Sequence, residues 1–340
     1  MRATIVGGGI GGLTVANHLI RNGWQVRILE RAATLPASGT ALGMWPPALH
    51  ALDAIGVGDR IREIGVPQAE GAILRPDGST IARLHVPGET LLVSRPALLD
   101  ALVADVSGAV EFSTSVDAVP GDCDVVVGAD GIGSPIRDRV FGSRYRPRPL
   151  GMAAWRGWVP GEATSTTETW DAGALFGITP RDGGLTNFFA AVRLPPGADD
   201  GGVAFLRSRF GHWHPAVRDV LDRIDGEALL HHDLLHSPAL PSYTRGKVAL
   251  IGDAAHAMAP NLGRGACEAM VDAITLGRAL TESEDVAAAL RRYDRARRHR
   301  TRLMVRGSET AARIATASRA RGARDALLGL ATRTTFHRAT

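Results

Sequence analysis

The sequence predicts an α/β protein in which a parallel-sheet domain is interrupted twice by a β-rich module and followed by C-terminal helices. Two glycine-rich stretches, one at the N-terminus and one at 245–280, each join a short apolar run to a run with helical periodicity. Between them lie short strand-like runs that carry several of the aromatic residues. The 340 residues, with 45% hydrophobic content, exceed the roughly 250 to 300 at which one core stops growing. We therefore expect one large or two intertwined domains.

The charge balance argues against nucleic acid as a partner. The formal net charge is +4, and Lys247 is the only lysine. A balance this small and dispersed gives solubility rather than a nucleic-acid surface. The one dense basic run, LRRYDRARRHRTRLMVR at 290–306, is interrupted by acidic and apolar residues, so it is interpreted as a solvated helix face.

The cysteines and the N-terminus favour a cytoplasmic protein. Cys123 and Cys267 are too few for a disulfide framework and lie in apolar stretches, which is typical of buried free thiols. The first strand follows the initiator directly, without a leader pattern, and no apolar run approaches the roughly 20 residues that cross a bilayer. We expect no membrane insertion, and either a monomer or a homodimer.

The first glycine-rich stretch has the pattern of a dinucleotide-binding turn. ATIV predicts a strand, GLTVANHLIRNG predicts a helix, and Gly7, Gly9 and Gly12 satisfy G-x-G-x-x-G. Glycine there permits a tight turn, approach of the backbone to a pyrophosphate and close packing of helix on strand, while the helix N-terminus attracts the phosphates. Glu30, which ends the strand WQVRILE, stands where an acid binds a ribose hydroxyl and repels a 2′-phosphate. The site is predicted to hold FAD or NAD rather than NADP.

Two further joints in the middle of the chain extend this domain. CDVVVGADGIGSPIRDRVFG predicts a buried strand at 123–127, a turn, and a helix capped by Ser134 with Pro135 at its first position. VSRPALLDALVADV predicts a helix entered through Pro96, with Arg95 near its N-terminal end. On physical grounds alone, each is only another entry into a helix.

The β-rich module falls in two segments of the chain. AILRPDGSTIARL predicts a hairpin around Asp77-Gly78, and MAAWRGWV, ALFGI and NFFAAV predict further strands, followed by a helical stretch at 203–224. The first domain is therefore expected at 1–67, 94–150 and 245–290, the β-rich domain at 68–93 and 151–244, and a C-terminal helical region at 291–340.

Aromatic pairs in the second segment predict a core face and a pocket face. Trp155 and Trp158 are three residues apart and Phe188 and Phe189 are adjacent, so the members of each pair face opposite sides of a sheet. One of each pair is expected in the core and the other in a pocket, and the sequence leaves open which. Arg156 is either a substrate contact or a salt-bridged strand residue.

The second glycine-rich stretch, VALIGDAAHAMAPNLGRGACEAMVDA, adds an aspartate to the strand-to-helix joint. A buried strand ends at Gly252-Asp253, and Pro260 and the sequence at 263–265 lead into a helix. A carboxylate beside a helix N-terminus suits a polyhydroxyl chain next to an electron-rich ring. The helix dipole would stabilise an anionic reduced ring by roughly a few tenths to 2 kcal/mol. This is the chemistry of a flavin.

With this motif the chain resembles the FAD-dependent aromatic hydroxylases of the para-hydroxybenzoate and salicylate hydroxylase type, the class A flavoprotein monooxygenases. Three motifs carry the resemblance in the family's order: GGGIGG with LER, GADGIGSPIR, and GDAAHAMAPNLGRG. It runs from Met1 to about Arg306 and includes AWRGWVPG and TETWDAGALFGITP. The resemblance implies a Rossmann-type FAD-binding domain, a discontinuous β-sheet-rich substrate domain and C-terminal helices, with both glycine-rich stretches at one FAD.

The resemblance implies a role for each residue that matches a family motif. The first motif would hold the pyrophosphate and the adenosine ribose, the second is associated with FAD and NAD(P)H, and the third would hold the ribitol and the isoalloxazine. The residues expected to bind FAD are Gly7, Gly9, Gly12, Glu30, Arg31, Arg95, Asp130, Asp253, Pro260, Gly263, Arg264 and Gly265. The residues expected to line the substrate pocket are Trp155, Arg156, Trp158, Phe176, Phe188 and Phe189.

The resemblance also implies a reaction. NADPH or NADH would reduce FAD without a second nucleotide-binding domain, and O2 would form a C4a-hydroperoxyflavin that gives one oxygen atom to an aromatic or polycyclic small molecule. Hydroxylation, epoxidation and Baeyer–Villiger insertion remain open. The alternatives are an FAD oxidase or dehydrogenase without oxygen transfer and a non-catalytic dinucleotide-binding module. No catalytic residue is assigned, because a general base is identified by its reach to the substrate.

The chain departs from the family's pattern at several positions. Arg264 stands where glutamine is common, which places a cation beside the flavin, while Ala41 and Pro47 stand where glycine and asparagine are usual. The segment at 110–124 is shorter than is typical. These differences bear on substrate and reaction outcome more than on FAD binding. The histidines lack an organised ligand spacing, so no metal is expected.

Overall fold

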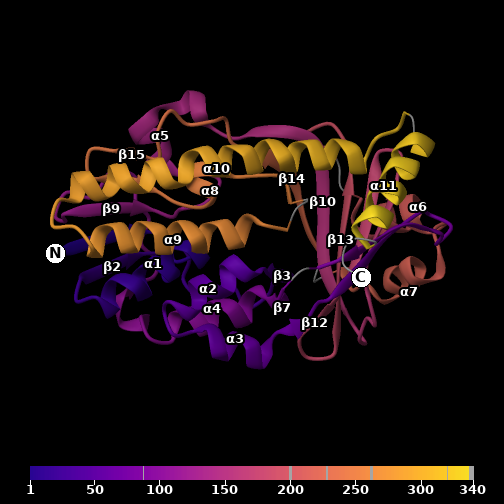
Figure 1. The fold of residues 1–340 in the computed structure, drawn as a ribbon, viewed down its shortest axis with the longest axis horizontal. Helices are drawn as coiled ribbons and strands as arrows, with labels where there is room; N and C mark the ends of the chain where they lie inside the picture. The colour runs from indigo at the N-terminus through magenta and orange to yellow at the C-terminus, as the bar shows by residue number, and fades with distance from the viewer. Residues whose placement is uncertain (87, 199–200, 227–228, 261–262, 320, 337–340) are drawn as a thin grey trace.

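Two lobes, each built on its own β-sheet, lie side by side along the long axis of the protein (Figure 1). The structure is a computed structural model that describes residues 1–336 except 87, 199–200, 227–228, 261–262 and 320. We call the six-stranded sheet of the first lobe sheet A and the seven-stranded sheet of the second lobe sheet C. A three-stranded sheet B lies in the chain segments that connect them.

Sheet A has the order β15-β16-β9-β1-β2-β8. All of its neighbouring strands are parallel except β15 and β16, which are antiparallel. The run Val125–Gly128 is buried throughout, as expected for a parallel strand covered on both faces. The strands are β1 (Arg2–Val6), β2 (Gln25–Leu29), β8 (Val110–Glu111), β9 (Val125–Gly128), β15 (Thr244–Arg245) and β16 (Val248–Leu250).

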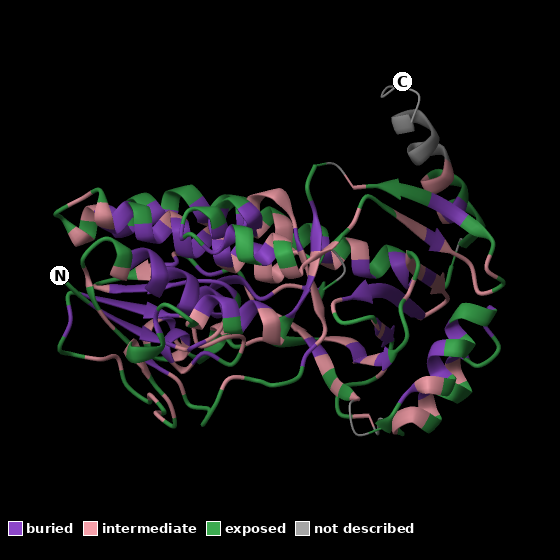
Figure 2. Ribbon diagram, turned by 90° about the horizontal axis from the view of Figure 1, so that it is seen from below, coloured by how far each residue is buried: buried purple, intermediate pink, exposed green. Residues whose placement is uncertain are grey.

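Helices bury sheet A, as the purple strands of Figure 2 show. Helix α1 is buried from Ile10 to Leu19 because α4 and α9 also pack against it. The amide of Asn17 donates to Leu102 O at 2.7 Å, which ties α1 to α4. The helices of this lobe are α1 (Ile10–Arg21), α2 (Pro46–Asp53), α3 (Gly58–Ile64), α4 (Arg95–Val103), α5 (Pro135–Phe141), α8 (Asp253–His256) and α9 (Gly265–Thr281). Short 3-10 helices occupy Ser107–Ala109 and Ser143–Tyr145.

Sheet C has the order β14-β10-β13-β12-β11-β5-β6 and joins both segments of the β-rich module. The hairpin expected around Asp77-Gly78 is present as the antiparallel pair β5 and β6, and β5 pairs with β11 in parallel. The strands are β5 (Glu70–Leu74), β6 (Thr80–His85), β10 (Arg148–Pro160), β11 (Thr166–Asp171), β12 (Ala174–Arg181), β13 (Leu185–Val192) and β14 (Leu230–His236). Helices α6 (Gly202–Phe210) and α7 (Pro215–Arg223) pack on one face.

The C-terminal helices span the two lobes. Helix α10 (Val286–Ala315) begins on α9 and ends on sheet C, where Ala312 and Ala315 join an apolar cluster with strand residues (Figure 1). Helix α11 (Arg321–Phe336) packs against β6. Sheet B contains β3 (Ala41–Met44), β7 (Leu91–Ser94) and β4 (Val66–Pro67). This small sheet was not predicted, because its strands are only two to four residues long.

The basic run at 290–306 is not a uniformly solvated helix face. It lies on α10, where most of its arginines are exposed, but Arg297 is buried and paired with Asp272 and Glu268 of α9. The interpretation of this run was therefore wrong at one position. Arg297 anchors α10 to α9, because two buried carboxylates compensate its charge.

Candidate active site

Four neighbouring strands of sheet A end at one edge, and each is followed by a residue predicted to bind FAD. Asp253 follows β16, Asp130 follows β9, Gly7 follows β1 and Glu30 follows β2. The strands are adjacent in the order β16-β9-β1-β2 and parallel, so their carboxyl ends meet. Ligands of open α/β sheets bind at this edge. Three motifs that are far apart in sequence thus form one site.

The glycines of the first motif differ in what surrounds them. Gly7 has a φ of +107°, and a Cβ atom there would lie 2.4 Å from Ala129 O, so only glycine fits. A Cβ atom on Gly12 would lie 2.0 Å from Gly7 O, which shows how closely α1 packs on the turn. A Cβ atom on Gly9, the N-cap of α1, would meet nothing within 4 Å. The open space at the helix N-terminus is where a pyrophosphate can approach.

Glu30 closes the first turn through backbone contacts. Its Oε2 accepts from Gly8 N at 2.6 Å and its Oε1 from Ala32 N at 2.8 Å. Each carboxylate oxygen has two lone pairs, so both keep capacity for a ribose hydroxyl. The neighbouring Arg31 is exposed and has no ion pair among the described residues, so its side chain is available to a ligand at the surface.

The second motif holds its own turn and contacts the third. Asp130 Oδ2 accepts from Ile136 N at 3.1 Å, Ser134 caps α5, and burial raises the pKa of Asp130. The buried Arg137 donates to Ile132 O at 2.8 Å and to Ala254 O at 3.4 Å. The arginine therefore fixes α5 relative to α8, next to the ribitol aspartate expected from the third motif.

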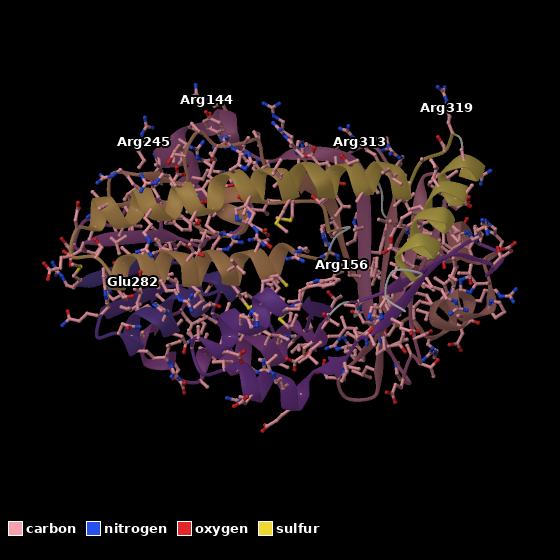
Figure 3. The ribbon with its side chains drawn as sticks, in the orientation of Figure 1. Arg144, Arg156, Arg245, Glu282, Arg313 and Arg319 are labelled. Carbon is pink, nitrogen blue, oxygen red and sulfur yellow. The ribbon has the colours of Figure 1, made fainter. Side chains whose placement is uncertain are left out.

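Asp253 is the main charged group at this edge. Its side chain is solvent-exposed although protein surrounds it closely, so it remains accessible to a ligand. Burial raises its pKa, while the charges of His256, Arg95 and Arg156 act in the opposite direction. Arg95 is the first residue of α4. Arg156 lies on β10 of sheet C, and Figure 3 shows it close to the N-terminal end of α9. Both lobes thus contribute a cation near Asp253.

The loop before α9 brings Arg264 to the same place. Gly263 N donates to Pro260 O at 2.7 Å, and a Cβ atom on Gly265 would lie 4.0 Å from Asp253 Oδ1. The guanidinium of Arg264 donates to Glu268 Oε1 at 3.3 Å and lies 5.7 Å from the centre of the Trp45 ring. Its buried Nε has no partner among the described residues. Asn261 and Leu262 of the loop lie outside the described residues.

Buried ion pairs support this loop and α8 from behind. Arg297 donates to Glu268 Oε2 at 2.5 Å and to Asp272 Oδ1 at 2.6 Å, and His256 Nε2 lies 2.5 Å from Asp272 Oδ2. Asp272 Oδ2 also accepts from Gly252 N at 2.9 Å. The network links Gly252, which precedes Asp253, to Glu268, which accepts from Arg264. The sequence analysis missed Glu268 and Asp272, although both lie on one face of α9 with a spacing of four residues.

The two faces of sheet C separate the predicted aromatic residues. Trp155, Phe176 and Phe188 have exposed fractions of 0, 0 and 1%, and they pack with α6 and α7. They serve the core, so their prediction as substrate contacts was wrong, because a strand residue can reach only one face. Trp158 and Phe189 lie on the opposite face with Arg156, and all three keep part of their surface exposed. Trp158 and Phe189 are therefore the members of each aromatic pair that stay partly exposed, on the face opposite α6 and α7.

The same face carries polar groups that the sequence analysis missed. Glu168 of β11 pairs with Gly177, which pairs with Phe189, so the three lie in one row across the sheet. Burial raises the pKa of Glu168 to about 7, and Trp170 Nε1 donates to its Oε1 at 2.5 Å. His232 pairs with Ala154 on this face, and burial together with Arg156 lowers its pKa to about 4. The alternation Glu168, Trp170 was the only signal available from sequence.

These residues fit FAD. The open helix N-terminus at Gly9 suits a diphosphate, Glu30 keeps acceptors for a ribose, and Asp253 offers a carboxylate to a polyol. Beside them, Arg264 Nε is a buried donor that has no hydrogen-bond partner within the described part of the chain. The order of these groups along the sheet edge matches the order of pyrophosphate, ribitol and ring in an extended dinucleotide.

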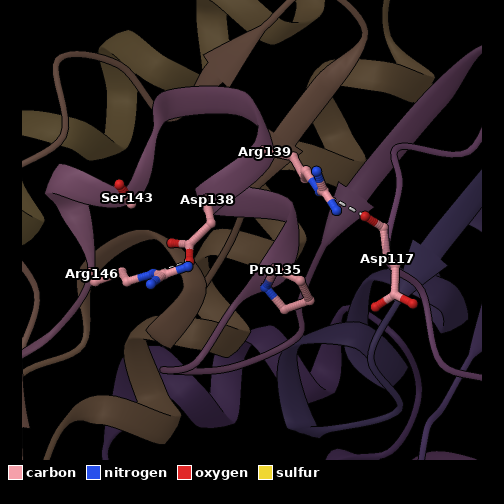
Figure 4. A pocket seen from close by; sticks show the side chains of 6 residues that line it. All are labelled: Asp117, Pro135, Asp138, Arg139, Ser143 and Arg146. Carbon is pink, nitrogen blue, oxygen red and sulfur yellow. Dashed lines mark hydrogen bonds and ion pairs between the residues drawn. The ribbon is translucent and has the colours of Figure 1, made fainter.

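A hollow elsewhere on the surface is separate from this site. It measures about 440 Å³ and is lined by residues of α5 and the following 3-10 helix (Figure 4). Both of its arginines already have protein partners, since Arg146 pairs with Asp138 at 2.6 Å and Arg139 donates to Asp117 O at 2.8 Å. Within the described ranges, no helix is long and apolar enough for a bilayer, and no group of three His, Cys, Asp or Glu residues is placed to hold a metal ion.

Comparisons with known proteins agree with this geometry. A family described as FAD binding domain matches residues 1–122 and 104–308. The aurachin C monooxygenase/isomerase of Stigmatella aurantiaca is 33% identical over 333 residues, covering 89% of this chain and 87% of that protein. The 2-heptyl-3-hydroxy-4(1H)-quinolone synthase of Mycobacteroides abscessus is 32% identical over 328 residues, covering 87% and 86%.

A solved structure places the same fold around FAD. Klebsiella pneumoniae HpxO, complexed with FAD and uric acid, superimposes with a TM-score of 0.89 at 26% identity, over 96% of this chain and 92% of that one. The predicted fold class and the family resemblance are thereby confirmed. The chain belongs to the FAD binding domain family and is an FAD-dependent monooxygenase of the aromatic hydroxylase type.

Proposed function

We propose that the protein consumes NAD(P)H and O2 to insert one oxygen atom into an apolar polycyclic aromatic molecule, with an alkyl-substituted quinolone as its substrate class. One observation carries the proposal. The face of sheet C that adjoins the FAD residues is mostly apolar, and its few polar groups are spaced apart. Apolar residues of this face, Met152, Ala154, Leu175, Ala191 and Leu234, are buried and pack with Ala259 and with Ala312 and Ala315 of α10, while the partly exposed Phe189 packs against them.

The residues of the sheet A edge would hold FAD in the order of their strands. The turn at 7–12 would bind the pyrophosphate, Glu30 and Arg31 the adenosine ribose, and Arg95 and Asp253 the ribitol. The loop at 260–265 would lie along the ring, with Asp130 supporting the turn beside it. FAD, when bound, supplies the hydride acceptor and the activation of O2.

The apolar face would orient an aromatic substrate against this ring. Phe189 and Trp158 provide flat apolar surfaces, while Arg156, Glu168 and His232 can each make one directed polar contact. A pocket of this kind fixes a large apolar ligand through a few polar groups. Two relatives support the substrate class, since one is named for aurachin C and one for a quinolone that carries a heptyl chain.

The nicotinamide co-substrate would bind without a domain of its own. Among the described residues, only sheet A, which is mostly parallel, has glycine-rich joints, and the proposed FAD site takes that edge. NAD(P)H therefore has to approach the flavin from the interlobe space. Cys123 and Cys267 are free and buried, which supports a reducing cytoplasm, and we propose a monomer or a homodimer there.

The test is anaerobic reduction of the FAD-loaded protein by NADH and by NADPH, followed by readmission of O2. Flavin bleaching is measured without ligand and with 2-heptyl-4(1H)-quinolone, urate and salicylate. We expect faster bleaching with the quinolone than with the two small polar aromatics. With 18O2, one labelled atom should then appear in the quinolone product.

Each other outcome selects a stated alternative. Flavin that is reduced and reoxidised without label in any product would indicate an oxidase or dehydrogenase. Stoichiometric FAD without ligand-stimulated reduction would indicate a non-catalytic module. Faster bleaching with urate alone would retain the monooxygenase and overturn the quinolone class.

A further inference from the structure

A second cavity is lined in part by Ala255 and His256 of α8, and several polar side chains lie among its apolar ones. It measures about 170 Å³ and lies between α10 and the chain that follows β14. Helices α8 and α10 are neighbours there (Figure 1). Asp253 is not among its lining residues, so this cavity is separate from the FAD site.

Three buried polar atoms in the wall of this cavity have no partner among the described residues. They are Nδ1 of His256, Oγ of Ser237 and Nε of Arg302. His256 and Ser237 are only 3 and 5% exposed. Native proteins satisfy nearly all buried polar atoms with protein, water or ligand. Three unsatisfied atoms around one cavity therefore indicate a binding site.

The unsatisfied atoms are donors. The Arg302 guanidinium has no acceptor, and its Nη2 already donates to Leu240 O. His256 Nε2 lies 2.5 Å from Asp272 Oδ2; burial lowers the pKa of His256, but Asp272 outweighs burial and raises it above its usual value. Nδ1 is the ring nitrogen left without a partner among the described residues; it donates to a ligand when the ring is protonated, and the Ser237 hydroxyl can donate as well.

The charges at the cavity mouth add to this donor character. Arg306 lines the mouth and has no ion pair among the described residues. The one acid at the mouth, Glu309, is already paired with His236 Nδ1 at 2.6 Å. Asp272 does not line the cavity and is shared between His256 and Arg297. The surplus charge facing the cavity comes from Arg302 and Arg306.

We infer that this cavity binds a small inorganic oxyanion of the phosphate type, held by His256, Ser237 and Arg302. An oxyanion offers several lone pairs and no competing donor, which matches three converging donors better than a neutral ligand does. Charge-assisted hydrogen bonds of this kind are the strong ones. The site does not depend on the proposed reaction.

The test uses the FAD-loaded protein with excess FAD, so that phosphate cannot occupy the pyrophosphate site. The melting temperature is followed as inorganic phosphate replaces chloride at constant ionic strength. A ligand that binds only the folded state raises the melting temperature in a saturable way. We expect such saturation for the wild type.

Two variants and a control locate the effect. Ser237→Ala removes a hydroxyl that has no hydrogen-bond partner in the described ranges, so the variant should fold normally and bind phosphate about tenfold more weakly. Arg302→Gln should weaken it more, whereas Arg300→Gln, the same charge change on an exposed position of α10, should leave it unchanged. A wild type without saturation, or a Ser237→Ala variant with the wild-type response, would overturn the site and leave the proposed function untouched.

Discussion

The ring of Phe189 lies directly on Gly177 of the neighbouring strand. A Cβ atom at position 177 would lie 2.1 Å from Phe189 Cζ, and the two residues are paired across β12 and β13. Phe189 also pairs with Arg156, on the face that adjoins the FAD residues. The missing side chain at 177 therefore sets how close the ring lies to the sheet, and with it the depth of the proposed substrate pocket.

Gly177→Ala should raise the substrate dissociation constant about tenfold while leaving FAD binding unchanged. The added methyl group displaces the Phe189 ring into the pocket, and overpacking of this kind costs about 1 to 3 kcal/mol of stability. The measurement is the flavin absorbance change on titration with an alkyl quinolone, together with the melting temperature.

Phe189→Ala supplies the control for this relationship. In that background Gly177→Ala meets no ring, so its effect on stability should fall below about 0.5 kcal/mol, the usual additivity error. Equal effects of Gly177→Ala in the two backgrounds would show that the ring contact does not matter.

The motif turns were predictable from the sequence because their chemistry is local. Gly12 is required by its contact with Gly7 O in the same turn, Gly7 has a φ of +107°, and Ser134 and Pro135 form the helix cap that their types favour. The fold class followed from these joints and from the aromatic runs of the second lobe. Sheet B was missed, since strands of two to four residues show no periodicity.

The pocket face could not be predicted because it depends on tertiary contacts. Periodicity separates Trp155 from Trp158, but only the position of α6 and α7 decides which of them is covered. Glu168 gives no sequence signal of its own, since its neighbours Gly177 and Phe189 come from other strands. Arg297 appeared to belong to a solvated run because its partners lie on another helix.

Asp253→Asn should weaken FAD and stabilise the apoprotein. A hydrogen bond to a charged group contributes about 1.5 to 3 kcal/mol, so the FAD dissociation constant should rise about 10- to 100-fold. Burial raises the pKa of Asp253 in the folded protein, so its stabilising contribution is present below an unfolded pKa of about 4 and is lost as pH rises. The melting temperatures of wild-type and variant apoprotein should coincide at low pH and diverge towards pH 8.

Asp100→Asn, the same change at an exposed position of α4, is the matched control and should alter neither quantity. An Asp253→Asn apoprotein that is less stable than the wild type at neutral pH would contradict the expectation that the ionised Asp253 carboxylate destabilises the folded apoprotein.

Arg264→Gln should lower the two-electron reduction potential of the bound flavin by about 30 mV, equivalent to about 1.4 kcal/mol. The reason is loss of a cation that Glu268 and Trp45 hold in the loop along the ring. Glu268 keeps its bond to Arg297, so the loop support survives the change. Potentials are measured by equilibration with a reference dye.

Arg264→Lys keeps the charge and should retain most of the wild-type potential. If both variants shift the potential equally, the hydrogen-bonding shape of the guanidinium matters rather than its charge. An unchanged potential in Arg264→Gln would place this arginine outside the field of the flavin.

Glu168→Gln should remove a pH dependence from substrate binding. Burial raises the pKa of Glu168 to about 7, against an effect of the Trp170 hydrogen bond that lowers it. The Glu168 carboxyl therefore changes from neutral to anionic between about pH 6 and 8, and a neutral aromatic ligand should bind several-fold more weakly at pH 8, because its binding would remove water from the ionised carboxylate. Glutamine keeps an acceptor for Trp170 and does not titrate, so its binding curve should be flat.

The stability of the Glu168→Gln variant tests the direction of the Glu168 pKa shift independently of ligand binding. Because the folded pKa lies above the unfolded value of about 4.3, the contribution of Glu168 to the unfolding free energy is complete below that value and is lost as pH rises through 7. The Glu168→Gln variant should thus match the wild type at pH 4 and exceed it at pH 8. Glu162→Gln, an exposed change in the same lobe, should show neither trend. A wild-type binding curve that stays flat across neutral pH would mean that Glu168 does not face the bound ligand.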